Sequence, residues 1–131
     1  MKRWLIALLV VAVAVTGISL VAYAQAKTKI VSIGASGPTP KTATIAKGTT
    51  VVWLNTMNDN VSIFFSKGKE VEAVCAAPTR FSLDSEGKYN SGPIPQGGTA
   101  SVCFVEAGKY SYEVVGQKMG GLRATGTIVV K

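Results

Sequence analysis

Residues 44–55 read TIAKGTTVVWLN, in which two runs rich in Thr, Val and Ile flank a Lys-Gly pair. Such residues favour the extended backbone of a strand, whereas Gly after a polar residue is typical of a tight turn. The stretch therefore predicts a strand over 42–45, a turn at Lys47 and Gly48, and a second strand over 49–54. It indicates an all-β protein.

The same alternation of short β-rich runs with turn residues continues on both sides of this stretch. No part of it carries a helical period. Loops rich in Gly, Pro, Asn and Ser are expected over 34–41, 55–60, 78–96 and 116–121. Further strands are expected over 30–33, 61–65, 70–76, 99–105, 109–115 and 124–130. About seven to nine strands at this spacing predict a two-sheet sandwich or a small barrel.

Alternation within each strand indicates which side chains face the interior, because successive residues of a strand point to opposite faces. Cys103 falls on the outward face of its strand and is expected to point away from the core. The residues expected in the interior are Trp53, Ala100, Val102, Phe104, Tyr110, Tyr112 and Val114.

Three stretches together resemble the cupredoxins, the plastocyanin and amicyanin group. The stretch 44–55 is similar to their strand-turn-strand motif ending in Trp-x-Asn, and GTIVV at 126–130 is similar to their closing strand. Gly97 and Gly98, followed by Phe104, Glu106, Gly108, Tyr110 and Tyr112, match a third motif of the family. The resemblance implies a two-sheet Greek-key β-sandwich over residues 28–131.

The resemblance also implies where copper ligands would lie. The family binds copper through two His, one Cys and usually a Met. Carried over position by position, the first His falls at Val61, the Cys at Val114, the second His at Gln117 and the axial Met near Met119. Valine cannot bind a metal, Gln is a poor substitute for imidazole, and the chain contains no histidine. We therefore expect no type-one copper and no other cofactor.

The lack of histidine also argues against catalysis, because it removes Ser-His-Asp and Cys-His arrangements and the common zinc motifs. The acidic residues form no evident acid-base pair. Asp84 and Glu86, for example, lie in a loop rich in Gly and Ser, where carboxylates are usually solvated. We expect no catalytic residues and no enzyme activity.

Cys75 and Cys103 are the only cysteines. In an exported domain, two cysteines most simply form one disulfide, and such a bond would hold residues 76–102 against the sandwich. The competing interpretation is a soft Cu(I) site that combines these cysteines with methionines. Neither cysteine lies at the family's ligand position, so we expect the disulfide.

The N-terminus has the composition of a targeting segment. Residues 1–3 are MKR, residues 5–24 carry no charge, and Ala22-Tyr23-Ala24 fits a signal-peptidase site before Gln25. The apolar run exceeds the ~7–15 residues usual for a signal peptide and approaches the ~20 that span a bilayer. Residues 1–24 are thus either a cleaved signal peptide or a membrane anchor. Both place the domain in the periplasm, outside the cell or on the outer face of the cytoplasmic membrane.

Charge and patterning narrow the class of partner. The formal net charge is +7, and without Lys2 and Arg3 the domain retains +5. The lysines are scattered and no aromatic-basic interleaving suggests a nucleic-acid surface. We expect a binding or assembly module for a protein partner or for a membrane or surface complex, with membrane association possible through residues 5–24. The candidate contact patch is Met57, Val61, Met119 and Leu122. The alternative is a copper-binding or electron-transfer protein with a rebuilt sulfur-donor site.

Overall fold

The computed structural model describes residues 27–131, so the predicted segment 5–24 lies outside the described residues. None of the helical structure within 27–131 has the length and apolarity that a bilayer crossing requires. One sheet contains β1 (Thr28–Gly34), β2 (Gly37–Thr39), β4 (Thr49–Asn55), β6 (Cys75–Thr79) and β9 (Thr99–Phe104). The other contains β3 (Thr42–Ile45), β5 (Val61–Phe65), β7 (Ser82–Leu83), β8 (Tyr89–Asn90), β10 (Gly108–Gly116) and β11 (Arg123–Val130). A short helix, α2 (Gly68–Ala73), joins β5 to β6.

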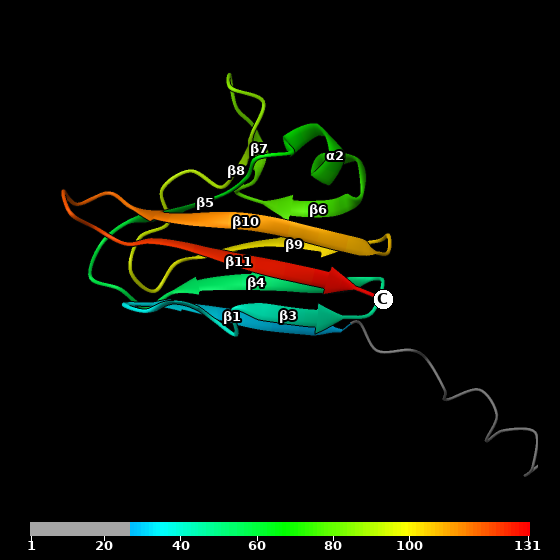
Figure 1. Cartoon of the computed structure of the whole chain (residues 1–131), viewed down its shortest axis with the longest axis horizontal. Helices are drawn as coiled ribbons and strands as arrows, with labels where there is room; N and C mark the ends of the chain where they lie inside the picture. The colour runs from blue at the N-terminus through cyan, green and yellow to red at the C-terminus, as the bar shows by residue number, and fades with distance from the viewer. Residues whose placement is uncertain (1–26) are drawn as a thin grey trace, which may run out of the picture.

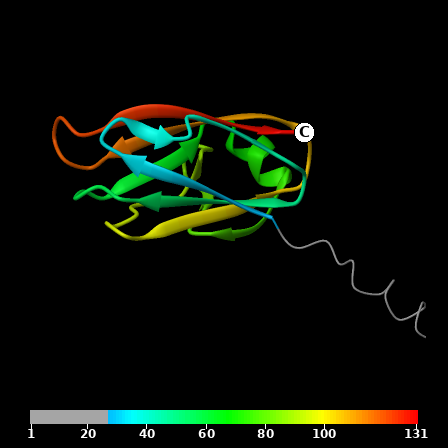
Figure 2. The same ribbon diagram turned by 90° about the horizontal axis from the view of Figure 1, so that it is seen from below.

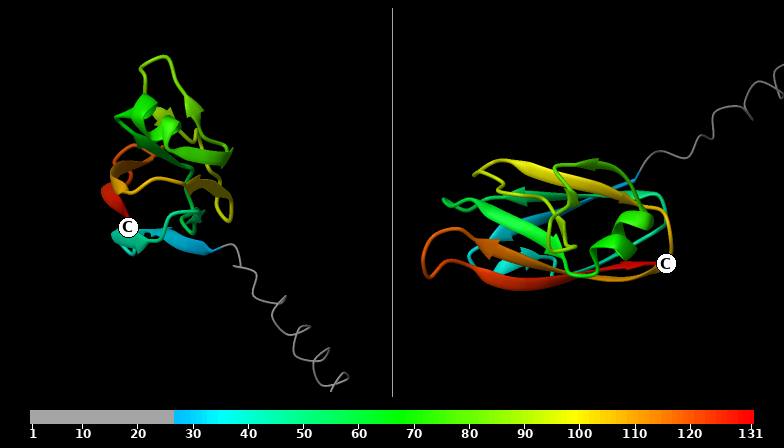
Figure 3. Two further views of the ribbon diagram at one scale, coloured as in Figure 1. Left: turned by 90° about the vertical axis from the view of Figure 1, so that its right-hand side faces the viewer. Right: turned by 90° about the horizontal axis from the view of Figure 1, so that it is seen from above.

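The strands labelled in Figure 1 form two sheets, which Figure 2 shows as two layers, and this confirms the predicted sandwich. The five-stranded sheet has the order β2-β1-β4-β9-β6 and the six-stranded sheet the order β3-β11-β10-β5-β8-β7. Most neighbouring strands are antiparallel, but β1 pairs in parallel with β4 and β3 in parallel with β11. As Figure 3 shows, α2 and the β7–β8 hairpin project along the side of the sandwich that lies away from β1 and β3.

The core lies between the sheets and is centred on Trp53, which is fully buried as predicted. Its ring makes edge contacts with Phe65, Phe81 and Tyr112 at centroid distances of 5.4–6.0 Å. Aromatic rings prefer such edge-to-face packing, which adds to the gain from burying their area. Ala100, Val102, Phe104, Tyr112 and Val114 are also buried, whereas Tyr110 is half-buried and stacks on Phe104 at 5.3 Å.

Gly126 makes the close packing of β10 on β11 possible. It lies directly opposite Tyr112 in the register. A Cβ at this position would lie 2.3 Å from the Tyr112 ring, which is far inside van der Waals contact. The aromatic ring therefore occupies the space that a side chain on β11 would need.

One predicted strand is wrong. We expected residues 70–76 to be extended, but residues 68–73 form α2 and only then does β6 begin. Gly68 gives the physical reason, because a Cβ there would lie 2.2 Å from the carbonyl oxygen of Gly87. The chain thus turns tightly against the backbone of the 87–89 segment, and Val71 is buried on the inner side of the helix.

Two of the predicted loops also contain short strands. Within 34–41, β2 pairs with the end of β1 through Ser32 and Thr39. Within 78–96, β7 and β8 form a hairpin whose β8 residues pair with Phe64 and Phe65 of β5. These strands are two or three residues long, too short for alternation to reveal.

Candidate functional site

Three loops meet at one end of the sandwich, which we call the loop end. They are the β4–β5 loop (56–60), the β10–β11 loop (117–122) and the turn at 94–98 (Figures 1 and 2). Backbone hydrogen bonds connect them. The Gln117 N–H donates to the Asn60 carbonyl at 3.0 Å, and the Gly97 N–H donates to the Asn55 carbonyl at 2.7 Å. The three loops therefore form one connected surface.

Asn55, at the end of β4, holds two of these loops from inside. Its side chain is fully buried. The amide Nδ2 donates to the carbonyls of Asp59 (2.7 Å) and Ile94 (2.9 Å), and Oδ1 accepts from the Met57 N–H at 2.9 Å. A buried amide is tolerated when its donors and acceptors are all paired, as here. Asn55 thus fixes the path of the β4–β5 loop.

Asp59 connects the β4–β5 loop to the β10–β11 loop. Its Oδ2 accepts from the Lys118 N–H at 3.1 Å, and the Lys118 ammonium donates in return to the Asn58 carbonyl. The approach depends on Gly116, where a Cβ would lie 2.8 Å from Asp59 Oδ2. The outer surface here is a shallow depression of about 300 Å³, lined by Asn58, Asp59, Asn60, Gln96 and Lys118.

The four positions that the resemblance assigned to copper ligands are divided between the core and the surface. Val61 and Val114 are completely buried on the inner face of the six-stranded sheet, where Val114 pairs with Ile63 and Val61 with Gly116. Gln117 is exposed in the loop, and Met119 is 98% exposed. Two positions are thus apolar core and two are surface, so these residues do not fit a copper ion. Within residues 27–131, no three His, Cys, Asp or Glu side chains gather as a metal site would require.

The predicted contact patch needs correction. Val61 is fully buried and cannot contact a partner, and Met57 and Leu122 are partly buried against the core. Met119 alone of the four projects freely. The depression at Lys118, the residue before Met119, is lined instead by polar side chains that sequence reasoning missed. The run Asn58-Asp59-Asn60 was the available signal, but its pairing with Lys118 depends on the fold.

The predicted disulfide is wrong, because both cysteines are free thiols. The register explains why. Cys75 lies opposite the buried Phe104 and packs against the core, whereas Cys103 lies opposite Ala76 on the outer face. Directly paired residues share a face, so the two side chains extend from opposite faces of the sheet. Burial, together with the nearby Cys103, raises the pKa of the Cys75 thiol to about 12.

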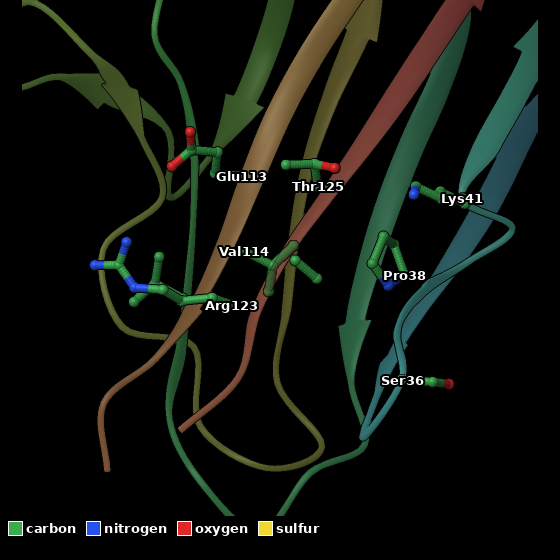
Figure 4. A pocket seen from close by; sticks show the side chains of 9 residues that line it. Ser36, Pro38, Lys41, Glu113, Val114, Arg123 and Thr125 are labelled. Carbon is green, nitrogen blue, oxygen red and sulfur yellow. The ribbon is translucent and has the colours of Figure 1, made fainter. Parts of the chain in front are cut away.

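A larger depression of about 500 Å³ lies beside β11 (Figure 4). Glu113 and Arg123 lie on one side of it, and Ser36, Pro38 and Lys41 on the other. Within residues 27–131, one salt bridge has a nitrogen–oxygen distance of 4.0 Å or less, and it joins Lys88 to Glu86. Glu113 and Arg123 therefore do not form an ion pair with each other. Glu113 is the one carboxylate among the residues that line this depression, and Thr125 lies opposite it in the register of β10 on β11.

Comparison with solved structures shows the fold. The Cu(I) form of a methionine-to-alanine mutant of amicyanin aligns over 84% of this chain and 87% of its own, with a TM-score of 0.55 and 18% sequence identity. The oxidised form of a proline-to-alanine mutant of amicyanin aligns over the same shares with a TM-score of 0.57 and 18% identity. No protein-family model matches the chain, and no curated protein matches its sequence. The chain therefore has the cupredoxin fold that its motifs resemble.

Proposed function

We propose that this protein is an exported, non-catalytic binding or assembly module that contacts a protein partner through its loop end. The observation that carries the proposal is the conversion of the inner ligand positions to buried valines, Val61 and Val114, beneath a polar, hydrogen-bonded surface. If a cupredoxin sandwich lacks the side chains that bind the metal, its function has to come from the molecules that its surface contacts.

The loop end has properties of a prearranged contact surface. Asn55 and Asp59 fix the loops, so little conformational entropy is lost when a partner binds. Met119 is almost fully exposed in a loop where Lys118 precedes it and Gly120 and Gly121 follow it, so its flexible apolar side chain can fill a pocket of the partner. The net charge of +5 on the domain favours an acidic partner, because opposite charge accelerates encounter.

The sulfur-donor alternative gains no support from the geometry. Cys75 and Cys103 point to opposite faces, and a pKa of about 12 leaves the Cys75 thiolate scarce at neutral pH. Cys103 lies opposite Thr50 at the start of β4, the end of the strand remote from Met57 and Met119. No described thiol and thioether can therefore share one ion without rearrangement of the sandwich.

Photo-crosslinking in the native cells tests the binding function. A photoreactive amino acid at Met119 should give one discrete adduct with a second protein, whereas the same group at Ser111, exposed on the six-stranded sheet, should not. Asp59→Ala should weaken the Met119 adduct, since it frees the β10–β11 loop. Equal adducts from both positions, or none from Met119, would contradict the proposal.

Copper titration tests the second part of the proposal, namely that the protein does not bind type-one copper. Adding Cu(II) to the purified protein should give no intense visible band and no rise in the unfolding temperature, because a ligand stabilises the folded state only by binding it preferentially. The control is amicyanin, a protein of the same fold whose Cu(I) form has been solved, treated in the same way. A stoichiometric type-one spectrum from the unmodified protein would overturn the proposal.

A further inference from the structure

The outer face of the five-stranded sheet carries no charged side chain at any of its strand positions. On β4 the outward residues are Thr50, Val52 and Leu54, which alternate with buried Val51 and Trp53. The strand registers place the remaining members of this face beside them: Thr28, Ile30 and Ser32 on β1, Thr39 on β2, Thr99, Ser101 and Cys103 on β9, and Ala76 and Thr79 on β6. We call these twelve residues the uncharged face.

The opposite face of the sandwich differs. The outward positions of β10 and β11 include Lys109, Glu113 and Arg123. The described chain as a whole contains twelve Lys and Arg against seven Asp and Glu. None of these nineteen charged residues lies on the uncharged face, although the face spans five strands, so it is a distinct surface. The charged residues next to it in sequence are Lys27, just before β1, and Arg80, just after β6.

We infer that the uncharged face is the contact surface of a homodimer, in which two copies pack face to face. This self-association is separate from the loop end and does not depend on the proposed function. Charge is the first argument for a second copy as the occupant. Two domains of net charge +5 repel each other. Contact through the uncharged face avoids placing lysines of one copy close to lysines of the other.

Chemistry is the second argument. In a two-fold interface a surface must complement itself, and a donor-only or acceptor-only group that lies on the two-fold axis meets its own copy. Thr and Ser hydroxyls both donate and accept, and they make up seven of the twelve residues of the uncharged face. Ile30, Val52 and Leu54 adjoin one another at its centre, and Ile30 is 58% exposed. This composition suits an apolar centre with a self-pairing polar surround.

Area sets the expected strength. Five strands about 4.8 Å apart and six residues of about 3.3 Å each span roughly 24 Å by 20 Å, or about 1,000 Å² for both copies. Stable complexes bury ~1,200–2,000 Å², so the dimer is expected to be weak and to form only at high protein concentration.

Sedimentation velocity over a range from about 5 to 500 μM tests the inference, with the full chain in mild detergent and with residues 27–131, which contain the whole described core. The mass of the wild type should rise toward that of a dimer. Val52→Lys places a charge at the centre of the uncharged face, flanked by Ile30 and Ser101, and should raise the dissociation constant at least about tenfold. Thr127→Lys is the matched control, because it adds the same charge at a half-buried outward position of the other sheet and should leave dimerisation unchanged.

The reactivity of Cys103 gives a second measurement of dimerisation, one that does not depend on the sedimenting mass. Its side chain lies on the uncharged face, so its alkylation by iodoacetamide should slow as the wild-type concentration rises and should not slow in Val52→Lys. A wild type that stays monomeric to 500 μM, or equal loss of dimer in both lysine variants, would overturn the inference. Binding of anionic lipid vesicles that Val52→Lys abolishes would also overturn it, in favour of a membrane as the occupant. The Met119 crosslink reports the loop end separately.

Discussion

At the residue scale, Asn55 shows how one buried polar side chain can shape a surface. It is fully buried at the end of β4, and its amide bonds two carbonyls and one N–H from different parts of the loop end. Without it the Met57 N–H and the Asp59 carbonyl would lose their partner, whereas the Ile94 carbonyl would keep the Val61 N–H, and an unpaired buried polar group costs ~1–3 kcal/mol.

Asn55→Ala should therefore lower the free energy of unfolding by about 2–4 kcal/mol, measured by urea denaturation. Asn58→Ala is the control, because the Asn58 side chain is exposed and its effect should stay within about 0.5 kcal/mol. Similar losses in the two variants would show that Asn55 does not organise the loops.

The two thiols should differ in reactivity. Thiolate is the reactive form of Cys, and burial raises the pKa of Cys75 from 9.0 to about 12. At pH 8, iodoacetamide should modify Cys75 more slowly than an ordinary thiol by a factor on the order of 100–1,000, scored by peptide mass spectrometry. In urea this protection should vanish. Rapid labelling of Cys75 in the folded protein, or a native mass that shows a disulfide, would contradict the structure.

At the element scale, the strands could be predicted from sequence where alternation runs for four residues or more. β4, β9 and β10 follow it closely, with Val51 and Trp53 inward and Val52 and Leu54 outward. The helix α2 could not be predicted, because six residues are too few for a helical period to appear. Its position depends on Gly68 fitting against the 87–89 backbone, a contact between distant segments that no local pattern encodes.

The β7–β8 hairpin depends on one carboxylate. Asp84 accepts hydrogen bonds from the backbone N–H groups of Lys88 and Glu86, each at 2.9 Å, and from Asn90 Nδ2 at 3.1 Å. The Lys88 N–H, followed by Asn90, lowers the pKa of Asp84 below its ordinary value. The hydrogen bonds of the folded hairpin thus stabilise the ionised form of the Asp84 carboxylate.

A lowered folded-state pKa gives stability that is present above the unfolded pKa and is lost as the pH falls through the folded value. The stability difference between wild type and Asp84→Asn should therefore be largest near neutral pH and shrink below about pH 4, followed by urea denaturation from pH 7 to 2.5. Glu86→Gln, which removes a neighbouring charge of the same loop, should show a smaller and flatter difference. A constant difference for Asp84→Asn across this range would refute the role of its charge.

At the scale of the whole molecule, the motifs predicted the sandwich but not its functional surface. The motifs that resemble the cupredoxins lie mainly in β4 and β9 of the five-stranded sheet and in β10 and β11 of the six-stranded sheet. The loop end depends instead on Asp59 meeting Lys118, residues 59 positions apart, across a gap that Gly116 leaves open. The ligand positions could be located as residues, but their separation into core and surface required the register of β5 on β10.

Within the described residues, the core runs from Val31 to Val130 and joins the inner faces of both sheets. We predict that residues 27–131 alone unfold at the same temperature as the full chain, within about 2 °C, because these buried side chains already pack against one another between the two sheets. Trp53 fluorescence of the short form reports the transition, since Trp4 is then absent. A short form without a cooperative transition would show that the N-terminal segment completes the fold.

Both ends of the described chain leave the sandwich at one pole. Thr50, at the start of β4, donates its N–H to Lys27, and Lys131 donates its N–H to Ile45, whereas the loop end lies at the opposite pole (Figure 2). β10, which runs between the poles, is nine residues or about 30 Å long. A fluorescent reporter or capture tag attached after Lys131 would thus sit clear of the loops around Met119. The domain can be immobilised by its tail on a biosensor chip with those loops presented to solution, the orientation in which a search for partners has to be made.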